Sequence, residues 1–484
     1  LEEKVGELVD AGRAPIYLVH FTQLACARTA QNLLSQKLTT KDEKRAISEE
    51  IAETKFNSPY GKELTRVIKG GIGIHHAGLL PRYRLLVEKL AQKGLLKVIC
   101  GTDTLGVGIN VPIRTVVLTQ LCKFDGSGTH LLRVRDFQQI CGRAGRRGFD
   151  EEGFVVAQAP EHVIENIKIR AKAEEKNRKP ILKRAPEKGF VPWDEGTFQK
   201  LIKSDSETLK SRFQLQPNHL LLLLGRDGED GCEAARQLIR SCHEADPKKK
   251  AIRQKSWKIV RDLLERGVLE IIPRSERNGP QKLRLSADLP EQFSLHEQLG
   301  IWLLDAIPQL DSTSLTYPFD LLSLVEAITE NPVIILRKQT DKAKTELLAE
   351  LKAEGVDYDE RIERLERVTW PKPGADFIYA TFNEFLAKCP WIDSENIRPK
   401  SIAREMFEDY CSFADYITRY GLERSEGVLL RHLSSVYTIL RHTVPETAKT
   451  EPVEEAERFL ETVLRETDST LLEEWSALQT KAAL

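Results

Sequence analysis

Short runs of β-branched and other apolar residues alternate with amphipathic stretches throughout residues 1–165, and this alternation restricts the fold more than any other feature of the chain. Short apolar runs of this kind are typical of buried strands. The predicted strands are 16–19, 72–74, 96–100, 115–118 and 154–157, and the predicted helices include 23–34, 84–92 and 134–144. Because strands that alternate with helices form a parallel sheet covered on both faces, we predict an α/β lobe over residues 1–165.

The chain has 484 residues, too many for a single hydrophobic core. We expect a basic linker over 166–199, which is either simply solvated or a strap that contacts phosphates. Residues 200–290 begin with predicted helices, one of them expected over 208–213. Two apolar runs on either side of Asn278-Gly279-Pro280 follow, which is the order of a winged-helix-like domain. Residues 291–484 show helical periodicity, including one helix over 403–416. They predict an all-α bundle with a solvated acidic tail from Glu446.

Charge is nearly balanced, with 72 Lys and Arg against 73 Asp and Glu, so any contact with nucleic acid must come from local basic faces. One such face lies before the expected wing and comprises Lys250, Arg253, Lys255, Lys258 and Arg261. A domain of this kind either touches nucleic acid or serves only as a structural bracket. The near-neutral balance also fits the alternative that residues 190–484 dock other proteins.

The eight cysteines form no CxxC pair, and we expect them to be reduced thiols in a cytoplasmic protein. No apolar run is long enough to span a membrane, so we expect no membrane partner. The adjacent His75 and His76 have no evident third ligand. We therefore expect no metal site at these two histidines.

The stretch Gln139–Gly148 carries two arginines, Arg143 and Arg146, spaced three residues apart with small residues between them. Such arginines at a helix end point the same way, and their guanidinium forks suit phosphate oxygens. In phosphoryl transfer they neutralise the charge that builds on the transferred group. A surface helix with a basic end is the alternative.

Two further loops follow predicted strands. Gly101–Pro112 is rich in hydroxyl groups and glycine, and Gly73–Pro81 contains the two histidines. Ligands of parallel sheets bind beyond the carboxyl ends of the strands, where threonine hydroxyls and backbone N–H groups can reach phosphates. Tight turns without a ligand are the alternative.

The blocks Pro15–Phe21, Gly73–Arg84, Gly101–Pro112 and Gln139–Gly148 resemble, in order and spacing, the second RecA-like lobe of superfamily 2 helicases of the DEAD/DEAH-box type. The wording HHAGLLP, GTDTLGVGINVP and QICGRAGRRG is similar to the Ski2-like subgroup. Several blocks in the correct order are far more specific than any one of them.

This resemblance implies roles for individual residues. It implies that Arg143 and Arg146 are catalytic arginine fingers. It assigns nucleotide binding to Gln139, Gly142, Gly108 and Asn110. It assigns contact with the tracked nucleic-acid strand to Thr102, Asp103, Thr104, His76, Gly78 and, further on, Arg431.

The remainder of the chain resembles the same helicases less specifically. Ser206–Leu224 resembles the segment after the motor in Ski2 and Mtr4 RNA helicases, and Glu426–His442 resembles the helix beside their strand exit. Arg431 on that helix is either a strand contact or part of a surface ion pair. Residues from about 190 onward resemble an actinobacterial-type helicase C-terminal region of unknown function.

The sequence contains neither a G-x-x-x-x-G-K-[ST] phosphate loop nor a D-E-x-[HD] motif. We therefore expect an N-terminal RecA-like lobe, encoded upstream of Leu1, to bind ATP with Mg²⁺, and we expect this chain to be inactive alone. The predicted function of the intact protein is ATP-dependent unwinding of nucleic acid, with single-stranded or duplex RNA favoured as partner. A DNA-repair or recombination helicase, and a binding fragment without activity, are the alternatives.

Overall fold

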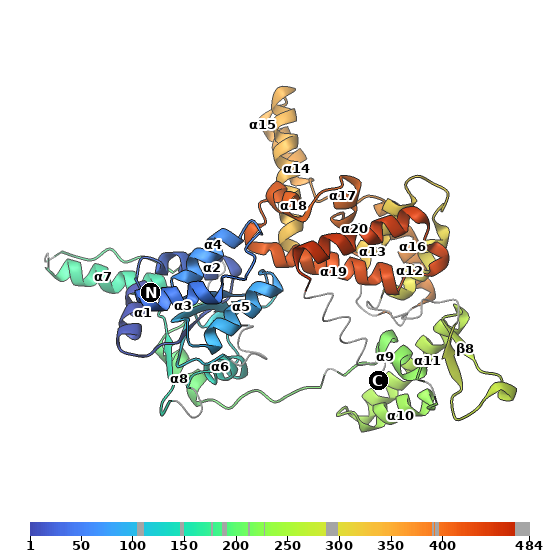
Figure 1. Cartoon of the computed structure of the whole chain (residues 1–484), viewed down its shortest axis with the longest axis horizontal. Coiled ribbons are helices and arrows are strands. Elements are labelled where there is room, and N and C mark those ends of the chain that lie inside the picture. Colours follow the sequence, from blue (N-terminus) through green and yellow to red (C-terminus); the bar gives the residue numbers. More distant parts are fainter. Residues whose placement is uncertain are drawn as a thin grey trace. The chain divides into compact units, whose positions relative to one another are not determined.

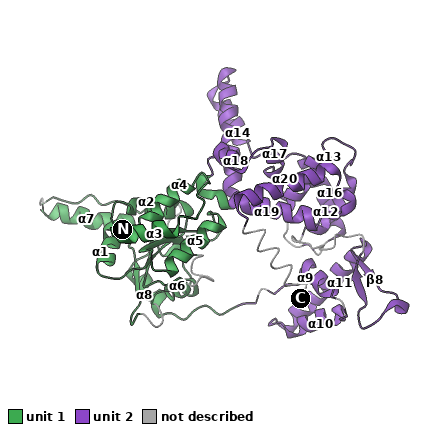
Figure 2. Ribbon diagram, in the orientation of Figure 1, with its two compact units in different colours: residues 1–209, 423–427 green, residues 210–422, 428–484 purple. Residues whose placement is uncertain are grey.

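The computed structural model describes the chain except for residues 104–110, 146–149, 176–177, 186–190, 212, 227, 287–298, 390–391, 393–395 and 470–484. The chain forms two compact units (Figure 2). Unit 1 comprises Leu1–Leu209 and Glu423–Gly427, and unit 2 comprises Lys210–Leu422 and Val428–Leu484. The short segment 423–427 therefore belongs to unit 1, although its neighbours in sequence on both sides belong to unit 2.

Unit 1 is built on a parallel sheet with strand order β2-β3-β1-β4-β7. Its strands are β1 (Ile16–His20), β2 (Ile72–His75), β3 (Val98–Thr102), β4 (Thr115–Leu118) and β7 (Phe154–Ala157). The side chains of β1 to β4 are buried on both faces, which requires the apolar runs seen in the sequence. The predicted parallel α/β lobe is confirmed.

The helices of unit 1 precede, connect and follow these strands (Figure 1). They are α1 (Glu2–Asp10), α2 (Gln23–Leu33), α3 (Lys41–Glu50), α4 (Gly61–Lys69), α5 (Pro81–Gln92), α6 (Val134–Cys141), α7 (Glu161–Glu175) and α8 (Glu195–Lys203). Local signals set several starts. Thr22 caps α2, Thr40 and Glu43 form a capping box on α3, and Pro81 opens α5.

Two parts of unit 1 differ from expectation. A small antiparallel hairpin joins β5 (Cys122–Phe124) to β6 (Thr129–Leu131), where no strands were predicted. Its turn is held by Asp125, whose carboxylate accepts hydrogen bonds from Ser127 and from the Gly128 N–H. In addition, α7 occupies Glu161–Glu175, so the stretch predicted as a basic linker from residue 166 begins as a helix.

The first part of unit 2 contains three helices followed by an antiparallel pair of strands. These are α9 (Pro217–Leu224), α10 (Gly231–Ser241), α11 (Asp246–Glu265), β8 (Leu269–Ile271) and β9 (Leu283–Leu285). Helices α9 and α10 both pack on α11, and the strands pack on α9 and α11. The order of helices and hairpin is the predicted one. The helix expected over 208–213 is absent from the described residues of that stretch.

The rest of unit 2 is helical, as predicted. Its helices are α12 (Gly300–Ala306), α13 (Tyr317–Ile328), α14 (Val333–Ala353), α15 (Tyr358–Glu366), α16 (Ala375–Lys388), α17 (Ala403–Glu408), α18 (Phe413–Tyr420), α19 (Glu426–His442) and α20 (Glu451–Thr467). The first two residues of α19 lie in unit 1 and the remainder in unit 2.

Two expectations for this region are wrong. The single helix expected over 403–416 is split into α17 and α18, because Tyr410 adopts a positive φ of 46° and Ser412 caps a new helix by accepting from the Asp415 N–H. The tail from Glu446 is not simply solvated, because α20 buries an apolar stripe and packs on α13 and α17. That stripe comprises Val453, Ala456, Leu460, Val463 and Leu464.

A buried polar cluster lies inside the helical part of unit 2. The fully buried carboxylate of Glu326 accepts hydrogen bonds from the N–H groups of Ile402, Ala403 and Arg404 and from Nε2 of His432, which is 2.8 Å away. Burial lowers the pKa of His432, so its ring is neutral and donates through Nε2. The ammonium group of Lys400 donates to several oxygens, including the backbone carbonyls of Glu326 and Thr329.

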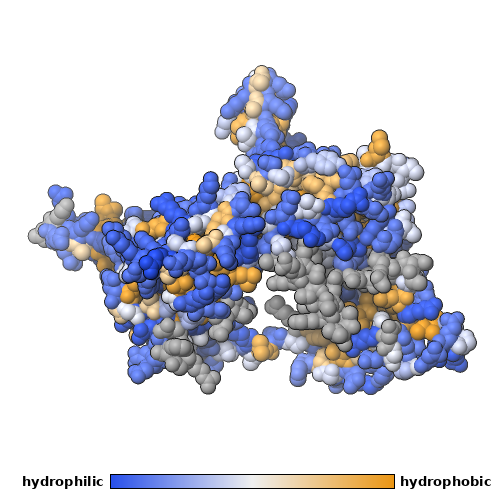
Figure 3. Space-filling model, viewed as in Figure 1, coloured by the Kyte–Doolittle hydropathy of each residue, from blue (hydrophilic) through white to orange (hydrophobic). Residues whose placement is uncertain are grey.

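The surface shown in Figure 3 is mostly hydrophilic, with small apolar patches scattered across it. Isolated exposed apolar side chains are ordinary on soluble domains. Among the helices of the described part of the chain, none is both long enough and apolar enough to cross a membrane.

Candidate functional site

The predicted site residues that the structure describes in unit 1 fall into two groups. His76–Gly78 follow the carboxyl end of β2, Thr102 ends β3 and Asp103 follows it. The strands β2 and β3 are neighbours in the sheet and pair His75 with Gly101. By contrast, Gln139, Gly142 and Arg143 lie at the end of α6. The residues just after Arg143 bond to Ile113, which precedes β4. The structure therefore brings the two loops together and places the end of α6 beside the amino end of β4.

The loop after β2 is shaped by its own histidine. His76 is 1% exposed, and its Nδ1 accepts a hydrogen bond of 3.1 Å from the Gly78 N–H. Burial, together with the charges of His75 and Arg84, lowers the pKa of His76 to about 4, so the ring is neutral. A side chain on Gly78 would approach Oε1 of Gln23 to 2.2 Å. His76 and Gly78 thus fix the path of the loop.

His75 has a different partner. Its Nε2 lies 2.9 Å from Oε1 of Glu88 on α5, and burial lowers its pKa despite that carboxylate. The two adjacent histidines therefore serve separate contacts. No cluster of three or more potential metal-ligating side chains is present among the described residues.

The loop after β3 is tied to α6 by a lysine that sequence reasoning missed. Nζ of Lys123 on β5 lies 3.4 Å from the carboxylate of Asp103 and 2.9 Å from that of Asp136 on α6. Burial lowers the pKa of Lys123, but the hydrogen bonds and charges of the two aspartates outweigh it, and the pKa is raised. No local signal marks this lysine, because it lies on a three-residue strand.

Thr102 is 9% exposed, and its carbonyl accepts a 2.5 Å hydrogen bond from the hydroxyl of Tyr17. Burial and the charge of Asp103 raise the pKa of Tyr17, whereas the charge of Arg143 lowers it. Asp103 and Arg143 are therefore both within electrostatic reach of the Tyr17 hydroxyl.

Arg143 is half-buried, while Gln139 and Gly142 are exposed at the end of α6. The backbone just after Arg143 is held closely. The Gly145 N–H donates to the Ile113 carbonyl at 3.0 Å, and Gly145 has a φ of +89°. A side chain on Gly153 would come within 2.6 Å of the Ala144 carbonyl. Glycine is needed at both positions, and together they fix the position of the Arg143 backbone.

Four predicted site residues, Thr104, Gly108, Asn110 and Arg146, lie outside the described residues. Their assigned roles remain predictions.

The start of α6 is capped from a distance. Arg133 offers no side-chain cap, and Glu207 instead accepts the Val134 N–H at 2.9 Å and the Arg135 N–H at 3.0 Å. These backbone hydrogen bonds lower the pKa of Glu207. Glu207 lies in Ser206–Leu224, which was singled out only by its resemblance. The missing cap on α6 was the one local sign that its first N–H groups need a remote partner.

The segment 423–427 packs against the loop that contains Gly78. The Gly427 N–H donates to the Gly78 carbonyl at 2.9 Å, and Oε1 of Glu426 accepts the Tyr60 N–H at 3.1 Å. A side chain on Gly427 would lie 2.3 Å from the Leu79 carbonyl oxygen. Burial raises the pKa of Glu426 to about 7. Sequence reasoning noticed the helix that begins here but not this contact.

Arg431 lies on α19 in unit 2 and is exposed, whereas Leu430 and His432 on either side of it are buried. Its predicted contact with a nucleic-acid strand remains a prediction.

Residues 34–148 match the family described as Helicase conserved C-terminal domain, and residues 159–484 match the family described as Domain of unknown function (DUF3516). The chain is 35% identical over 173 residues to the DExH-box ATP-dependent RNA helicase DExH11 of Arabidopsis thaliana, covering 34% of this chain and 13% of that protein.

Two other relatives extend the comparison. Superkiller complex protein 2 of Mus musculus is 28% identical over 303 residues, or 61% of this chain and 21% of that protein. The Probable helicase HelY of Mycobacterium tuberculosis is 36% identical over 163 residues, or 32% of this chain and 18% of that protein. The chain thus spans at most about a fifth of the length of these relatives.

The parallel α/β lobe, its motif-bearing loops and these matches define the C-terminal part of a Ski2-like superfamily 2 helicase. More particularly, the chain belongs to the DUF3516 family, whose match covers all of unit 2 and the end of unit 1.

Proposed function

We propose that the intact protein uses ATP hydrolysis to move along single-stranded nucleic acid and to separate duplexes. The observation that carries this proposal is the arrangement at the end of α6. There the half-buried Arg143 lies on a backbone fixed by glycine contacts, beside the exposed Gln139 and Gly142. A match to the helicase C-terminal domain over residues 34–148 supports it.

The residues at this helix end fit a nucleotide triphosphate. A guanidinium fork pairs with phosphate oxygens, a glycine lets a phosphate chain approach, and an amide side chain can orient polar groups. ATP with Mg²⁺ supplies the phosphoanhydride bond whose hydrolysis releases free energy. Arg143 neutralises negative charge at the terminal phosphate, and Gln139 orders the site. We assign the metal to an N-terminal RecA-like lobe, because these 484 residues contain no phosphate loop or D-E-x-[HD] motif.

We propose that the loops after β2 and β3 border the path of the nucleic-acid strand, with Asp103 and Thr104 continuing the second loop. Because the side chains of His76 and Thr102 are almost fully buried, we assign them to shaping the loops rather than to direct contact with phosphates. Lys123 then links this path to the arginine helix through Asp103 and Asp136. Such a link gives a physical route by which strand and nucleotide sites influence each other.

RNA is the favoured substrate because the Arabidopsis relative is named an RNA helicase. The mycobacterial relative is named only a probable helicase, and DNA is therefore the alternative substrate. The test is ATP hydrolysis by the intact protein with single-stranded RNA or DNA of the same sequence and length. We expect stronger stimulation by RNA. Stimulation by DNA alone would overturn the RNA assignment, and no stimulation by either would overturn the helicase proposal.

A further inference from the structure

Helices α10 and α11 of unit 2, labelled in Figure 1, carry the residues that line a groove. Its charge differs sharply from that of the whole chain. Its volume is about 360 Å³. The lining residues are Arg236, Ile239, Arg240, Asp246, Lys249, Lys250 and Arg253. Five cations thus face one carboxylate in a chain that is otherwise nearly neutral. Like charges placed this closely repel one another, and a polyanionic ligand relieves that repulsion.

The groove is a built feature rather than a chance gathering of mobile side chains. Nζ of Lys249 donates to the backbone carbonyl of Arg240 at 2.8 Å, which ties the start of α11 to the end of α10. Arg236 and Arg240 each place one guanidinium nitrogen near Glu233, at 3.1 and 3.2 Å. Their other nitrogens retain donor capacity, because a guanidinium carries five N–H groups.

Two cations of the groove are uncommitted within the part of the chain that the structure describes. Lys250 and Arg253 are exposed and make no hydrogen bond or ion pair with any described residue. They lie three positions apart on α11 and therefore point the same way. The first turn of α11, which carries no side-chain cap, adds the positive end of a helix dipole to the same groove.

An aromatic side chain extends the groove. Trp257 lies one turn beyond Arg253, is 42% exposed, and has the guanidinium of Arg236 5.7 Å from its ring centroid. Arg236, Arg253 and Trp257 also line the adjoining cavity together. A cationic groove beside an exposed aromatic ring is the arrangement that holds single strands, with phosphates on the cations and a base on the ring.

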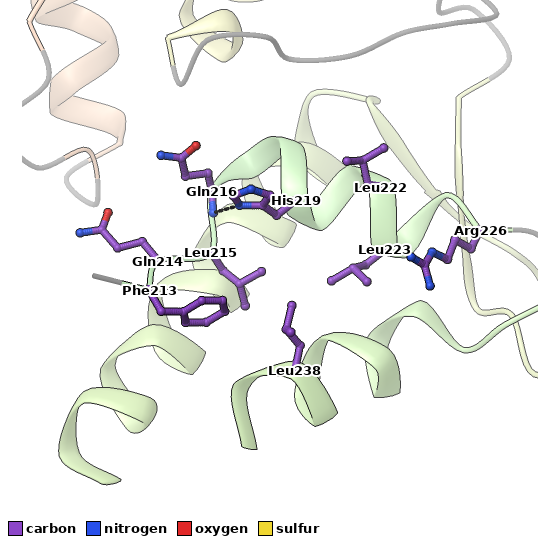
Figure 4. A pocket seen from close by; sticks show the side chains of 9 residues that line it. All are labelled: Phe213, Gln214, Leu215, Gln216, His219, Leu222, Leu223, Arg226 and Leu238. Atoms are coloured by element: carbon purple, nitrogen blue, oxygen red, sulfur yellow. Dashed lines mark hydrogen bonds between the residues drawn. The ribbon is translucent and has the colours of Figure 1, made fainter. Parts of the chain in front are cut away.

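A second cavity, near α9, lacks the positive charge of the groove. It has a volume of about 530 Å³, and Phe213, Leu215, Leu223 and Leu238 converge on it, while Gln214 and Gln216 point away (Figure 4). Its lining is mainly apolar. It also includes Arg226, which lies 3.5 Å from Glu229, and His219, whose Nδ1 accepts the Gln216 N–H, so it holds far less positive charge than the groove. The basic groove is therefore not a general property of this group of helices.

We propose that the groove between α10 and α11 binds the phosphate backbone of single-stranded nucleic acid, with one base stacked on Trp257. This deepens the proposed function, on which it rests, by adding a strand-binding site in unit 2 to the loops of unit 1. The proposal also separates the basic residues of α11 into those that line the groove and those that do not. Lys250 and Arg253 line the groove, whereas Lys255 and Lys258 do not.

The test uses the 484-residue chain and a labelled mixed-sequence RNA 20-mer, with binding followed by fluorescence anisotropy between low and physiological salt. Lys250→Glu and Arg253→Glu should each weaken binding about tenfold or more at low salt and reduce the salt slope by roughly one. The matched control is Lys258→Glu, because Lys258 is an exposed lysine on the same helix outside the groove. It should change binding less than about twofold.

Stacking is tested separately. Trp257→Leu should weaken single-strand binding by at least about fivefold while leaving binding of a 20-base-pair duplex nearly unchanged. Thermal unfolding and near-ultraviolet circular dichroism verify that each variant is folded. Equal losses in Lys250→Glu and Lys258→Glu would overturn the proposal. So would competition by a polyglutamate peptide as effective as competition by RNA.

These results are distinguishable from a failure of the helicase proposal. Binding by this chain is measured without ATP, whereas the helicase proposal fails only if ATP hydrolysis by the intact protein does not respond to nucleic acid.

Discussion

Two groups of polar residues, one in each unit, are used in opposite ways. In unit 2 the carboxylate of Glu326 is fully buried, and backbone N–H groups and His432 surround it. In unit 1 Gln139 and Gly142 are exposed, and it is the backbone behind Arg143 that is packed tightly, through glycine at 145 and 153. Buried polar clusters with satisfied hydrogen bonds specify architecture. Exposed polar side chains on a fixed backbone are prepared for a ligand.

The largest effect that we expect to support this comparison is a loss of ATP hydrolysis. Arg143→Ala in the intact protein should slow nucleic-acid-stimulated ATP hydrolysis by roughly 10³-fold, equivalent to about 4 kcal/mol. Thermal unfolding of the variant reports separately on the stability that this half-buried side chain contributes. Arg135→Ala, on the same helix, is the control. A similar loss in both variants would argue against a special role for Arg143.

In unit 2 the opposite result is expected. Glu326→Ala should lower the free energy of unfolding by roughly 3–5 kcal/mol, because several buried donors lose their acceptor. Urea unfolding measures this change. Glu330→Ala, an exposed glutamate just beyond the same helix, should stay within about 0.5 kcal/mol of the parent. If Glu326→Ala left the free energy of unfolding unchanged, the buried cluster of unit 2 would not have the structural role that distinguishes it from the site in unit 1.

Glu426 differs from the exposed polar residues of unit 1 because its carboxyl group is buried. We therefore expect the stability of the protein to depend on pH through this group. Its folded pKa of about 7 is raised above the ordinary 4.5. The protonated Glu426 side chain therefore contributes fully to the free energy of unfolding below about pH 4.5. This contribution is lost as the pH rises through 7, because the unfolded chain ionises at lower pH than the folded one. Glu426→Gln cannot ionise, so it should gain stability relative to the parent between pH 5 and 8, by up to about 3 kcal/mol.

Melting temperatures across that pH range provide the measurement. Glu330→Gln, the same substitution at an exposed glutamate, reports the effect of removing a charge alone. A pH-independent difference between the parent and Glu426→Gln would show that Glu426 ionises normally.

The smallest effect concerns backbone contact. Gly427→Ala should lower the free energy of unfolding by about 1–3 kcal/mol. The added methyl group would meet the Leu79 carbonyl oxygen and push the two backbone segments apart. Faster hydrogen exchange at residues 77–80 would report the loosened loop. Gly279→Ala is the control, because nothing lies within 4 Å of the added carbon there. Unchanged exchange in Gly427→Ala would mean that the segment does not hold the loop.

Sequence predicted the elements whose signals are local. Thr115–Leu118 and Phe154–Ala157 are strands with the bounds expected, because each is a compact apolar run with polar or glycine neighbours. The three-residue strands β5 and β6 are too short to show alternation. The break between α17 and α18 depends in part on Tyr410, whose positive φ no sequence pattern predicts.

For the candidate site, the sequence predicted the motif residues but not the residues that support them in the structure. Arg143 and the loops of His76 and Thr102 were found because their residue types form recognisable blocks. Glu207 and Lys123 support those blocks from separate elements. Glu426 contacts Tyr60 across 366 residues of sequence, and no periodicity or spacing reaches that far.

The contact of Gly427 with Leu79 has a practical consequence for dissecting the protein. A truncation that stops at residue 209 would strip five residues from the surface of the lobe, leaving the Tyr60 N–H and the Gly78 carbonyl without their acceptor and donor. Such a fragment would misreport the stability of the loop it was made to study. Supplying 423–427 through a fused linker would restore the missing patch.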